Sequence, residues 1–128
     1  MSLQQKPLQK DIDIALVNET IIDAIQEIKG ENIVKLDLRS LSESPTDFFI
    51  ICDASSNTQI SAIADNIQKR LKIEFGLLPS HFEGKTEAKW VLLDYFYTVV
   101  HVFYPETREF YELEDLWSDA KITEFKSI

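Results

Sequence analysis

The chain has 128 residues, of which 45% are hydrophobic, and a formal net charge of −9. This length fits a single domain with enough apolar side chains for a packed core. The acidic charge disfavours direct contact with nucleic acid, because a phosphate backbone repels it. Cys52 is the single cysteine, which excludes an internal disulfide, and no apolar run reaches the ~18 residues that span a bilayer. We therefore expect a cytoplasmic protein with no membrane contact.

The first expected element is a helix that follows a flexible leader. Pro7 and closely spaced charges predict a leader over residues 1–15, and residues 16–128 then form one domain. Asn18 is a suitable helix N-cap, and Gly30 offers the left-handed residue that commonly ends a helix. Isoleucines recur between these two positions at helical spacing. They are Ile21, Ile22, Ile25 and Ile28.

Two strands and a second helix are expected next. Alternating apolar and charged residues predict a strand over residues 33–38, and the apolar run Phe48–Cys52 predicts a central strand buried on both faces. Ser56 or Asn57 can cap the second helix, which ends before Gly76. One face of this helix is apolar. It consists of Ile60, Ile63, Ala64, Ile67 and Leu71.

Two β-like runs, Trp90–Tyr95 and Val99–Phe103, are close enough in the chain to form a hairpin. A two-residue turn at Phe96 and Tyr97 sets a register in which three cross-strand pairs share one face. The pairs are Trp90 with Phe103, Leu92 with His101, and Asp94 with Val99. This mixture of aromatic, apolar and polar groups is typical of an interface centre, and burial of both faces under helices is the alternative. Neither turn aromatic readily adopts a positive φ, so a wider loop is an alternative to the two-residue turn.

The chain beyond the hairpin is acidic and contains a further apolar set. Pro105 ends the second strand, and the apolar residues predict a short strand or turn followed by a helix that packs on the domain. These residues are Phe110, Tyr111, Leu113, Leu116 and Trp117. The excess of carboxylates over Arg108 in residues 106–119 suits a basic partner, although a solvated acidic surface is the commoner reason for such a segment. Alternating helices and strands with an antiparallel hairpin predict an α/β fold with a mixed β-sheet and packed helices.

Few residues point to catalysis. The three glycines lie far apart, which argues against a phosphate-binding loop, and no histidine or cysteine pair has metal-ligand spacing. Asp11 and Asp13 have the spacing of a two-metal site but lack a preceding Gly-Ser turn. A magnesium-dependent nucleotidyltransferase that uses Asp37, Asp47 and Asp94 is the enzymatic alternative. We expect no metal and no cofactor.

Several blocks of sequence follow one another over residues 16–120. They are Asp37-Leu38, Thr46–Cys52, Ser56–Gln59, Ile63–Asn66, Glu83-Gly84, Trp90–Tyr95, Val99–Phe103 and Arg108–Trp117. In order and spacing this series resembles the ribosomal silencing factor, or Iojap-related, family. Two positions depart from the family pattern, which usually has glycine at the position of Ala54 and Gly-Asp at Phe96-Tyr97.

The resemblance implies a nucleotidyltransferase-like fold that has lost catalysis, so the expected activity is binding and the protein is not an enzyme. Members of the family bind the large ribosomal subunit through the universal large-subunit ribosomal protein number fourteen. They obstruct joining of the small subunit and so repress translation. The acidic charge of this chain suits such a basic partner better than it suits RNA. A homodimer that pairs through the apolar hairpin face is a third alternative.

The resemblance also implies where the partner binds. Trp90 and Leu92 are expected to be anchors, and Asp94 is expected to pair with a cation or a backbone donor. Tyr95 and His101 are expected to make hydrogen bonds at the rim. The full set of expected partner-binding residues is Glu83, Gly84, Trp90, Leu92, Asp94, Tyr95, His101 and Phe103.

Overall fold

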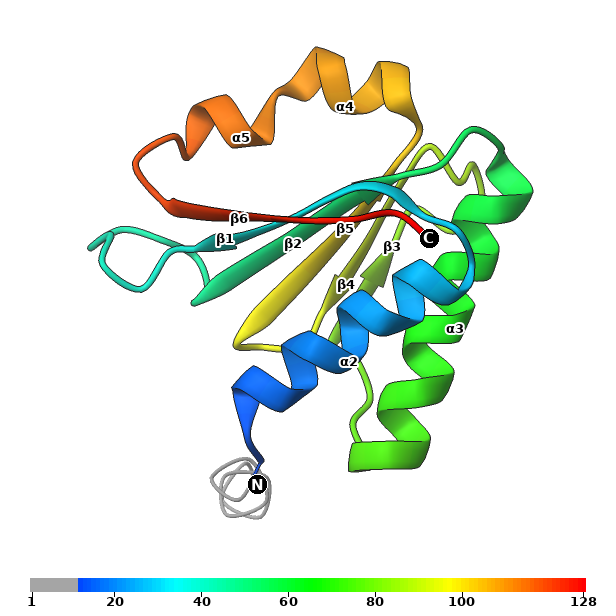
Figure 1. Ribbon diagram of the computed structural model, residues 1–128, viewed down its shortest axis with the longest axis horizontal. Coiled ribbons are helices and arrows are strands. Elements are labelled where there is room, and N and C mark those ends of the chain that lie inside the picture. Colours follow the sequence, from blue (N-terminus) through cyan, green and yellow to red (C-terminus); the bar gives the residue numbers. More distant parts are fainter. Residues whose placement is uncertain (1–11) are drawn as a thin grey trace.

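A computed structural model describes residues 12–128 as one mixed six-stranded sheet with helices on both faces (Figure 1). The strand order is β3-β4-β5-β2-β1-β6, and every neighbouring pair is antiparallel except β2 and β5. The mixed α/β architecture predicted from the sequence is thereby confirmed. In chain order the elements are α2 (Ile14–Glu27), β1 (Glu31–Asp37), β2 (Phe48–Asp53), α3 (Asn57–Phe75), β3 (His81–Glu83), β4 (Trp90–Asp94), β5 (Thr98–Phe103), α4 (Pro105–Tyr111), α5 (Leu113–Leu116) and β6 (Lys121–Phe125).

Helix α2 begins five residues earlier than predicted, because its N-cap is Asp13 and not Asn18. The carboxylate of Asp13 accepts a hydrogen bond from the backbone N–H of Ala15 at 3.0 Å and so caps the helix. Asn18, the expected cap, is buried in the helix, and its side-chain oxygen accepts a hydrogen bond from the Thr98 hydroxyl at 2.6 Å. The cap prediction was wrong because Asn18 has a tertiary partner on β5.

Residues 14 and 15, the last two of the expected leader, belong to α2. Residues 1–11 lie outside the described part of the chain, and with them Asp11 of the Asp11-x-Asp13 pair. None of the helices within residues 12–128 combines the length and the apolar character needed to cross a membrane.

The end of α2 uses a left-handed residue one position earlier than expected. Lys29 has a φ of 66°, whereas Gly30 does not have a positive φ. Gly30 is needed for close packing, because a Cβ atom at this position would collide with the side chain of Ile25. Gly30 therefore does mark the end of the helix, but because of close packing and not because of a left-handed backbone.

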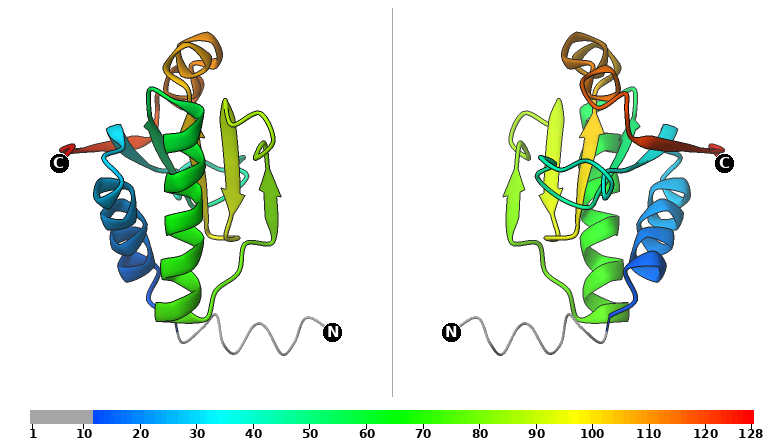
Figure 2. Two further views of the ribbon diagram at one scale, coloured as in Figure 1. Left: turned by 90° about the vertical axis from the view of Figure 1, so that its right-hand side faces the viewer. Right: turned by 90° about the vertical axis from the view of Figure 1, so that its left-hand side faces the viewer.

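Helix α3 agrees with the prediction at both ends. The Ser56 hydroxyl accepts a hydrogen bond from the Gln59 N–H at 3.1 Å, and Gly76 closes the helix with a φ of 69°. All five residues of the predicted apolar face are buried. Helices α2 and α3 lie side by side on one face of the sheet (Figure 2).

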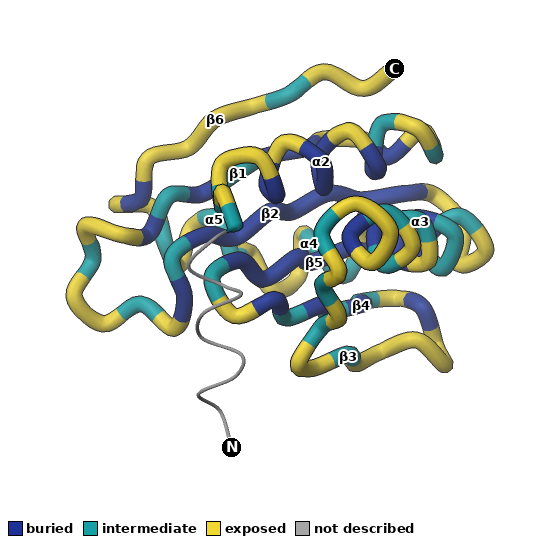
Figure 3. The backbone as a smooth tube through the Cα atoms, turned by 90° about the horizontal axis from the view of Figure 1, so that it is seen from below, coloured by how far each residue is buried: buried dark blue, intermediate teal, exposed yellow. Residues whose placement is uncertain are grey.

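The sheet separates two apolar cores. One core lies between the sheet and helices α2 and α3, and it contains Val91, Leu93 and Val102 of the hairpin. The second core lies on the opposite face, where Leu113 and Trp117 of the α5 segment pack against the sheet. Strand β2 is buried along its whole length, as expected for a central strand, whereas the edge strands β3 and β6 are mostly exposed (Figure 3). Neither edge strand was predicted.

Helices α4 and α5 contain no buried residue, and a polar contact adds to the apolar packing of Leu113 and Trp117 in joining them to the sheet. The Arg108 guanidinium donates to the Asp53 carboxylate at 2.9 Å, to the Asn32 carbonyl oxygen at 2.7 Å and to the Glu114 carboxylate at 2.6 Å. The side chains of Arg108 and Asp53 are only 11% and 6% exposed. Arg108 therefore joins α4 and α5 to the adjacent ends of β1 and β2.

Replacing Arg108 tests this contact. We expect Arg108→Ala to lower the free energy of unfolding by about 3 kcal/mol, because it leaves the Asp53 carboxylate buried without its cation. Urea unfolding followed by circular dichroism measures the change. Arg39→Ala is the matched control, since the Arg39 side chain is 62% exposed and loss of its ion pair with Asp37 should lower the free energy of unfolding far less. Equal effects of the two substitutions would contradict the role assigned to Arg108.

Candidate protein-binding site

The β4–β5 hairpin has the register predicted from the sequence. Trp90 pairs with Phe103, Leu92 with His101, and Asp94 with Val99. The loop is the two-residue turn and not the wider alternative, because the Tyr95 N–H donates to the Thr98 carbonyl oxygen at 2.8 Å. One hairpin face therefore carries Trp90, Leu92 and Asp94, as the alternation of strand side chains requires.

The turn of the hairpin depends on Asp94. Phe96 has a φ of 77°, a conformation that we considered unfavourable for an aromatic residue. The Asp94 carboxylate accepts a hydrogen bond from the Phe96 N–H at 2.8 Å, and the Tyr97 N–H donates to the Tyr95 carbonyl oxygen at 2.9 Å. Aspartate commonly stabilises turns in this way. Asp94 thus has a structural role in addition to the binding role expected for it.

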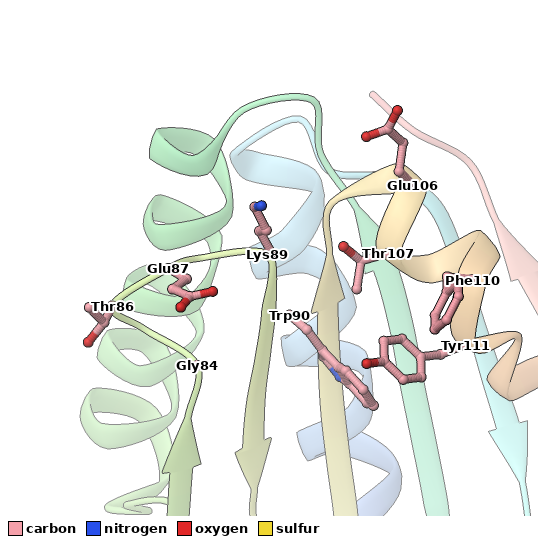
Figure 4. Close-up of a pocket in the computed structure, with 9 residues that line it drawn as sticks. All are labelled: Gly84, Thr86, Glu87, Lys89, Trp90, Glu106, Thr107, Phe110 and Tyr111. Carbon is pink, nitrogen blue, oxygen red and sulfur yellow. The ribbon is translucent and has the colours of Figure 1, made fainter.

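Trp90 is the half-buried centre of an aromatic group. Its indole ring centroid lies 4.9 Å from that of Phe103 and 4.7 Å from that of Tyr111. The indole Nε1–H donates a hydrogen bond to Nδ1 of His101 at 3.1 Å. Figure 4 shows the rings of Trp90 and Tyr111 lying toward one another, one from β4 and the other from α4.

A groove of about 640 Å³ opens beside this aromatic group. The β3–β4 loop forms one wall and helix α4 the other (Figure 4). Phe110 and Tyr111 are 77% and 50% exposed, which is unusual for large aromatic side chains. We call this feature the aromatic groove. It is lined by Gly84, Thr86, Glu87, Lys89, Trp90, Glu106, Thr107, Phe110 and Tyr111.

Gly84 allows the β3–β4 loop to lie against β4. Its φ is 88°, and a Cβ atom at this position would fall on the Trp90 carbonyl oxygen. The neighbouring Glu83 pairs with Leu92 across β3 and β4. The structure therefore places Glu83 and Gly84 beside the hairpin face, as the family resemblance implied.

The structure divides the expected partner-binding residues into three groups. Glu83 and Gly84 are exposed, and Trp90, Leu92 and Asp94 are half-buried on the hairpin face. Tyr95, His101 and Phe103 are buried. The expected rim hydrogen bonds of Tyr95 and His101 are wrong for this conformation, because Tyr95 lies in the helix-covered core and His101 lies beneath Trp90.

The sequence analysis missed the wall of the groove that α4 provides. Glu106, Phe110 and Tyr111 line the groove, yet the two aromatic residues were expected to pack in the core. The position of Pro105 was the available signal, because proline at the first position of a helix is common. A helix starting there turns Phe110 outward, close in the chain to the exposed carboxylates of Glu106, Glu109, Glu112 and Asp115.

Burial determines the protonation of His101. Removal from water lowers the pKa of His101 to about 4, so the imidazole is neutral near pH 7. In the neutral ring Nδ1 is the acceptor of the Trp90 hydrogen bond, and the proton is therefore on Nε2. The Nε2 atom is buried without a hydrogen-bond partner among the described residues.

The three carboxylates of the enzymatic alternative do not form a cluster. Asp37 and Asp94 end strands β1 and β4, which are separated in the sheet by β2 and β5. The Arg39 guanidinium beside Asp37 donates to that carboxylate and lowers its pKa. Within residues 12–128, no group of three or more histidine, cysteine, aspartate or glutamate side chains is placed to hold a metal ion.

Comparison with known proteins identifies the family. The family model described as "Ribosomal silencing factor during starvation" matches residues 12–128. The chain belongs to this family. Its membership confirms the resemblance drawn from the sequence blocks, and the family name describes regulation of ribosomes and not catalysis.

Individual relatives agree with the family assignment. The chain is 37% identical over 107 residues to a ribosomal silencing factor RsfS of Halalkalibacterium halodurans, covering 84% of this chain and 90% of that protein. It is 38% identical over 102 residues to the chloroplastic protein Iojap of Zea mays, covering 79% of this chain and 43% of that protein. A crystal structure of a protein from Chromobacterium violaceum has a TM-score of 0.78 at 36% identity, covering 84% of this chain and 88% of that one.

The burial of His101 makes the stability of this silencing-factor family member depend on pH. The folded pKa is about 4 and the ordinary value is 6.5, so the unfolded chain binds a proton between these values that the folded chain does not. Stability is therefore lost as the pH falls through this window. We expect His101 to account for about 2 kcal/mol of the loss in unfolding free energy between pH 7 and pH 5.

Urea unfolding at the two pH values measures this contribution. The loss between pH 7 and pH 5 should be smaller in His101→Leu than in the unaltered protein. Ile73→Leu is the control, because Ile73 is an exposed apolar residue without a titratable group and its replacement should leave the loss unchanged. A pH dependence that is the same in all three proteins would contradict the burial of a neutral imidazole.

Proposed function

We propose that this chain binds the large ribosomal subunit through the universal large-subunit ribosomal protein number fourteen, and that its bulk prevents the small subunit from joining. The observation that carries the proposal is the aromatic groove, which lies beside the hairpin face in a member of a family named for silencing ribosomes. Binding alone accounts for repression of translation in this scheme. No catalytic group is required.

The composition of the groove supports recognition of a protein. Tryptophan and tyrosine are enriched among the residues that dominate interface energetics. Trp90 is half-buried and Tyr111 is half-exposed, so both have apolar surface to bury against a partner. Leu92 extends this surface along β4, and Glu83 and Gly84 border it from β3.

The charge of the surrounding surface supports a basic partner. Helices α4 and α5 and the residue between them expose the carboxylates of Glu106, Glu109, Glu112 and Asp115. Arg108 does not offset this charge at the surface, because its guanidinium is bound to Asp53 and Glu114. A hydrogen bond with the Asp115 carboxyl raises the pKa of Glu112, which shows how closely the acidic groups are placed. Such a surface attracts a basic ribosomal protein and repels RNA phosphates.

Sedimentation with separated ribosomal subunits tests the proposed partner. We expect the chain to pellet with the large subunit and not with the small one, and to reduce the yield of joined ribosomes when both are present. Retention on free ribosomal protein number fourteen after nuclease treatment would separate protein recognition from RNA recognition. Complete ribosomes that assemble normally at saturating excess of the chain would refute the proposed function.

Truncation of the expected anchors tests the location of the site. Trp90→Ala or Leu92→Ala should weaken binding to the large subunit by about 2 kcal/mol, because each removes apolar contact at the centre of the interface. Ile73→Ala is the control, since Ile73 is a highly exposed apolar residue on α3, on the opposite side of the sheet. Circular dichroism establishes that each variant is folded. Unchanged affinity in folded Trp90 and Leu92 variants would show that the partner does not bind at this face.

A second copy of the chain is the alternative occupant of the same face. Sedimentation of the free protein at several concentrations detects self-association. A dimer that dissociates when ribosomal protein number fourteen is added would be consistent with the proposed function, whereas a dimer that resists it would not.

A further inference from the structure

Trp90 owes its position on the hairpin face to side chains that lie beneath it. The indole N–H donates to His101 Nδ1 at 3.1 Å, and the indole ring rests near the ring of Phe103. His101 is only 4% exposed, so a bound partner has little access to it. Any effect of the imidazole on recognition therefore passes through Trp90.

The imidazole ring is itself held firmly. Phe49 contacts His101 in a T-shaped arrangement, with ring centroids 4.7 Å apart and an interplanar angle of 81°. Phe103 is nearly parallel to the same ring, at 6.1 Å and 12°. Phe49 comes from the adjacent strand β2, and Phe103 comes from β5, the strand of His101 itself, so the fold fixes the direction of the Nδ1 lone pair.

The presence of histidine at this position disfavours folding in one respect. Its Nε2–H is buried with no hydrogen-bond partner among residues 12–128, and an unpaired buried donor loses its contact with water without compensation. An aliphatic side chain would avoid this loss. The hydrogen bond between the side chains of His101 and Trp90 is what the imidazole provides and an aliphatic residue cannot.

We propose that His101 is a positioning residue for partner binding, whose Nδ1 holds the Trp90 indole in the orientation that borders the aromatic groove. This proposal rests on the proposed function, because it concerns the same site. An indole fixed before binding loses less conformational freedom in the complex than a free one. The hydrogen bond also occupies the only donor of the indole, so Trp90 offers the partner its ring surface and no hydrogen-bond donor.

Two substitutions separate positioning from packing. His101→Leu removes the Nδ1 acceptor and substitutes an apolar side chain of similar size. His101→Asn places a side-chain oxygen near the position of Nδ1 and is the conservative variant. NMR spectroscopy of the free ¹⁵N-labelled protein follows the indole N–H of Trp90, with the indole of Trp117 as the internal reference.

We expect His101→Leu to shift the Trp90 indole signal and to accelerate its exchange with water about tenfold, while the Trp117 signal stays unchanged. His101→Asn should restore slow exchange. In binding to the large subunit, His101→Leu should weaken affinity roughly three- to tenfold, and His101→Asn should recover most of the loss. In a Trp90→Phe background, His101→Leu should have no further effect on affinity, because the hydrogen bond is already absent.

Distinct results overturn this proposal and the proposed function. If Trp90→Ala weakens binding but His101→Leu changes neither indole exchange nor affinity, the positioning role is refuted and the proposed function stands. If the unaltered chain does not bind the large subunit, the proposed function fails, and the role of His101 in binding fails with it. Should His101→Leu not fold, the unaltered protein decides: slow exchange of the Trp90 indole supports the proposal, and exchange as fast as in an exposed indole refutes it.

Discussion

The candidate site depends first on the register of the β4–β5 hairpin. Alternation along β4 sends Val91 and Leu93 into the core under α2 and α3, and it sends Trp90 and Leu92 to the opposite face. A slip of one residue would exchange the two faces. The indole would then lie in the core against α2 and α3, and Val91 and Leu93 would lie on the opposite face. The carboxylate of Asp94 stabilises the turn that fixes this register, so it shapes the site even where it touches no partner.

The aromatic groove also needs a second wall, which a different interaction supplies. Its two sides come from segments about twenty residues apart in the chain, the β3–β4 loop and helix α4. Apolar burial alone does not hold α4 there, because none of its residues is buried. The Arg108 guanidinium supplies the connection through Asp53 and Glu114, and Tyr111 then lies 4.7 Å from the Trp90 ring. A buried polar contact thus positions an exposed apolar surface.

Sequence periodicity predicted the elements that have one buried and one exposed face. It failed where a contact with a distant part of the chain determines the position of a side chain. Helix α3 and the hairpin register follow from regular apolar spacing, because each buries one face along its whole length. Asn18 has the chemistry of a cap, but only the fold shows that Thr98 uses its oxygen. Strand β6 exposes nearly every residue and therefore carries little alternation. Tyr111 is apolar enough for a core, and only the position of α4 turns it outward.

The sparse anchoring of α4 and α5 has an evolutionary consequence. Folding constrains Arg108, together with the packed Leu113 and Trp117, but it places little demand on the other side chains of the two helices. Substitutions at those outward positions are nearly neutral for the fold, so natural selection can adjust them to the surface that they meet. Under the proposed function, sequence change that is correlated with the partner should therefore concentrate on this short segment.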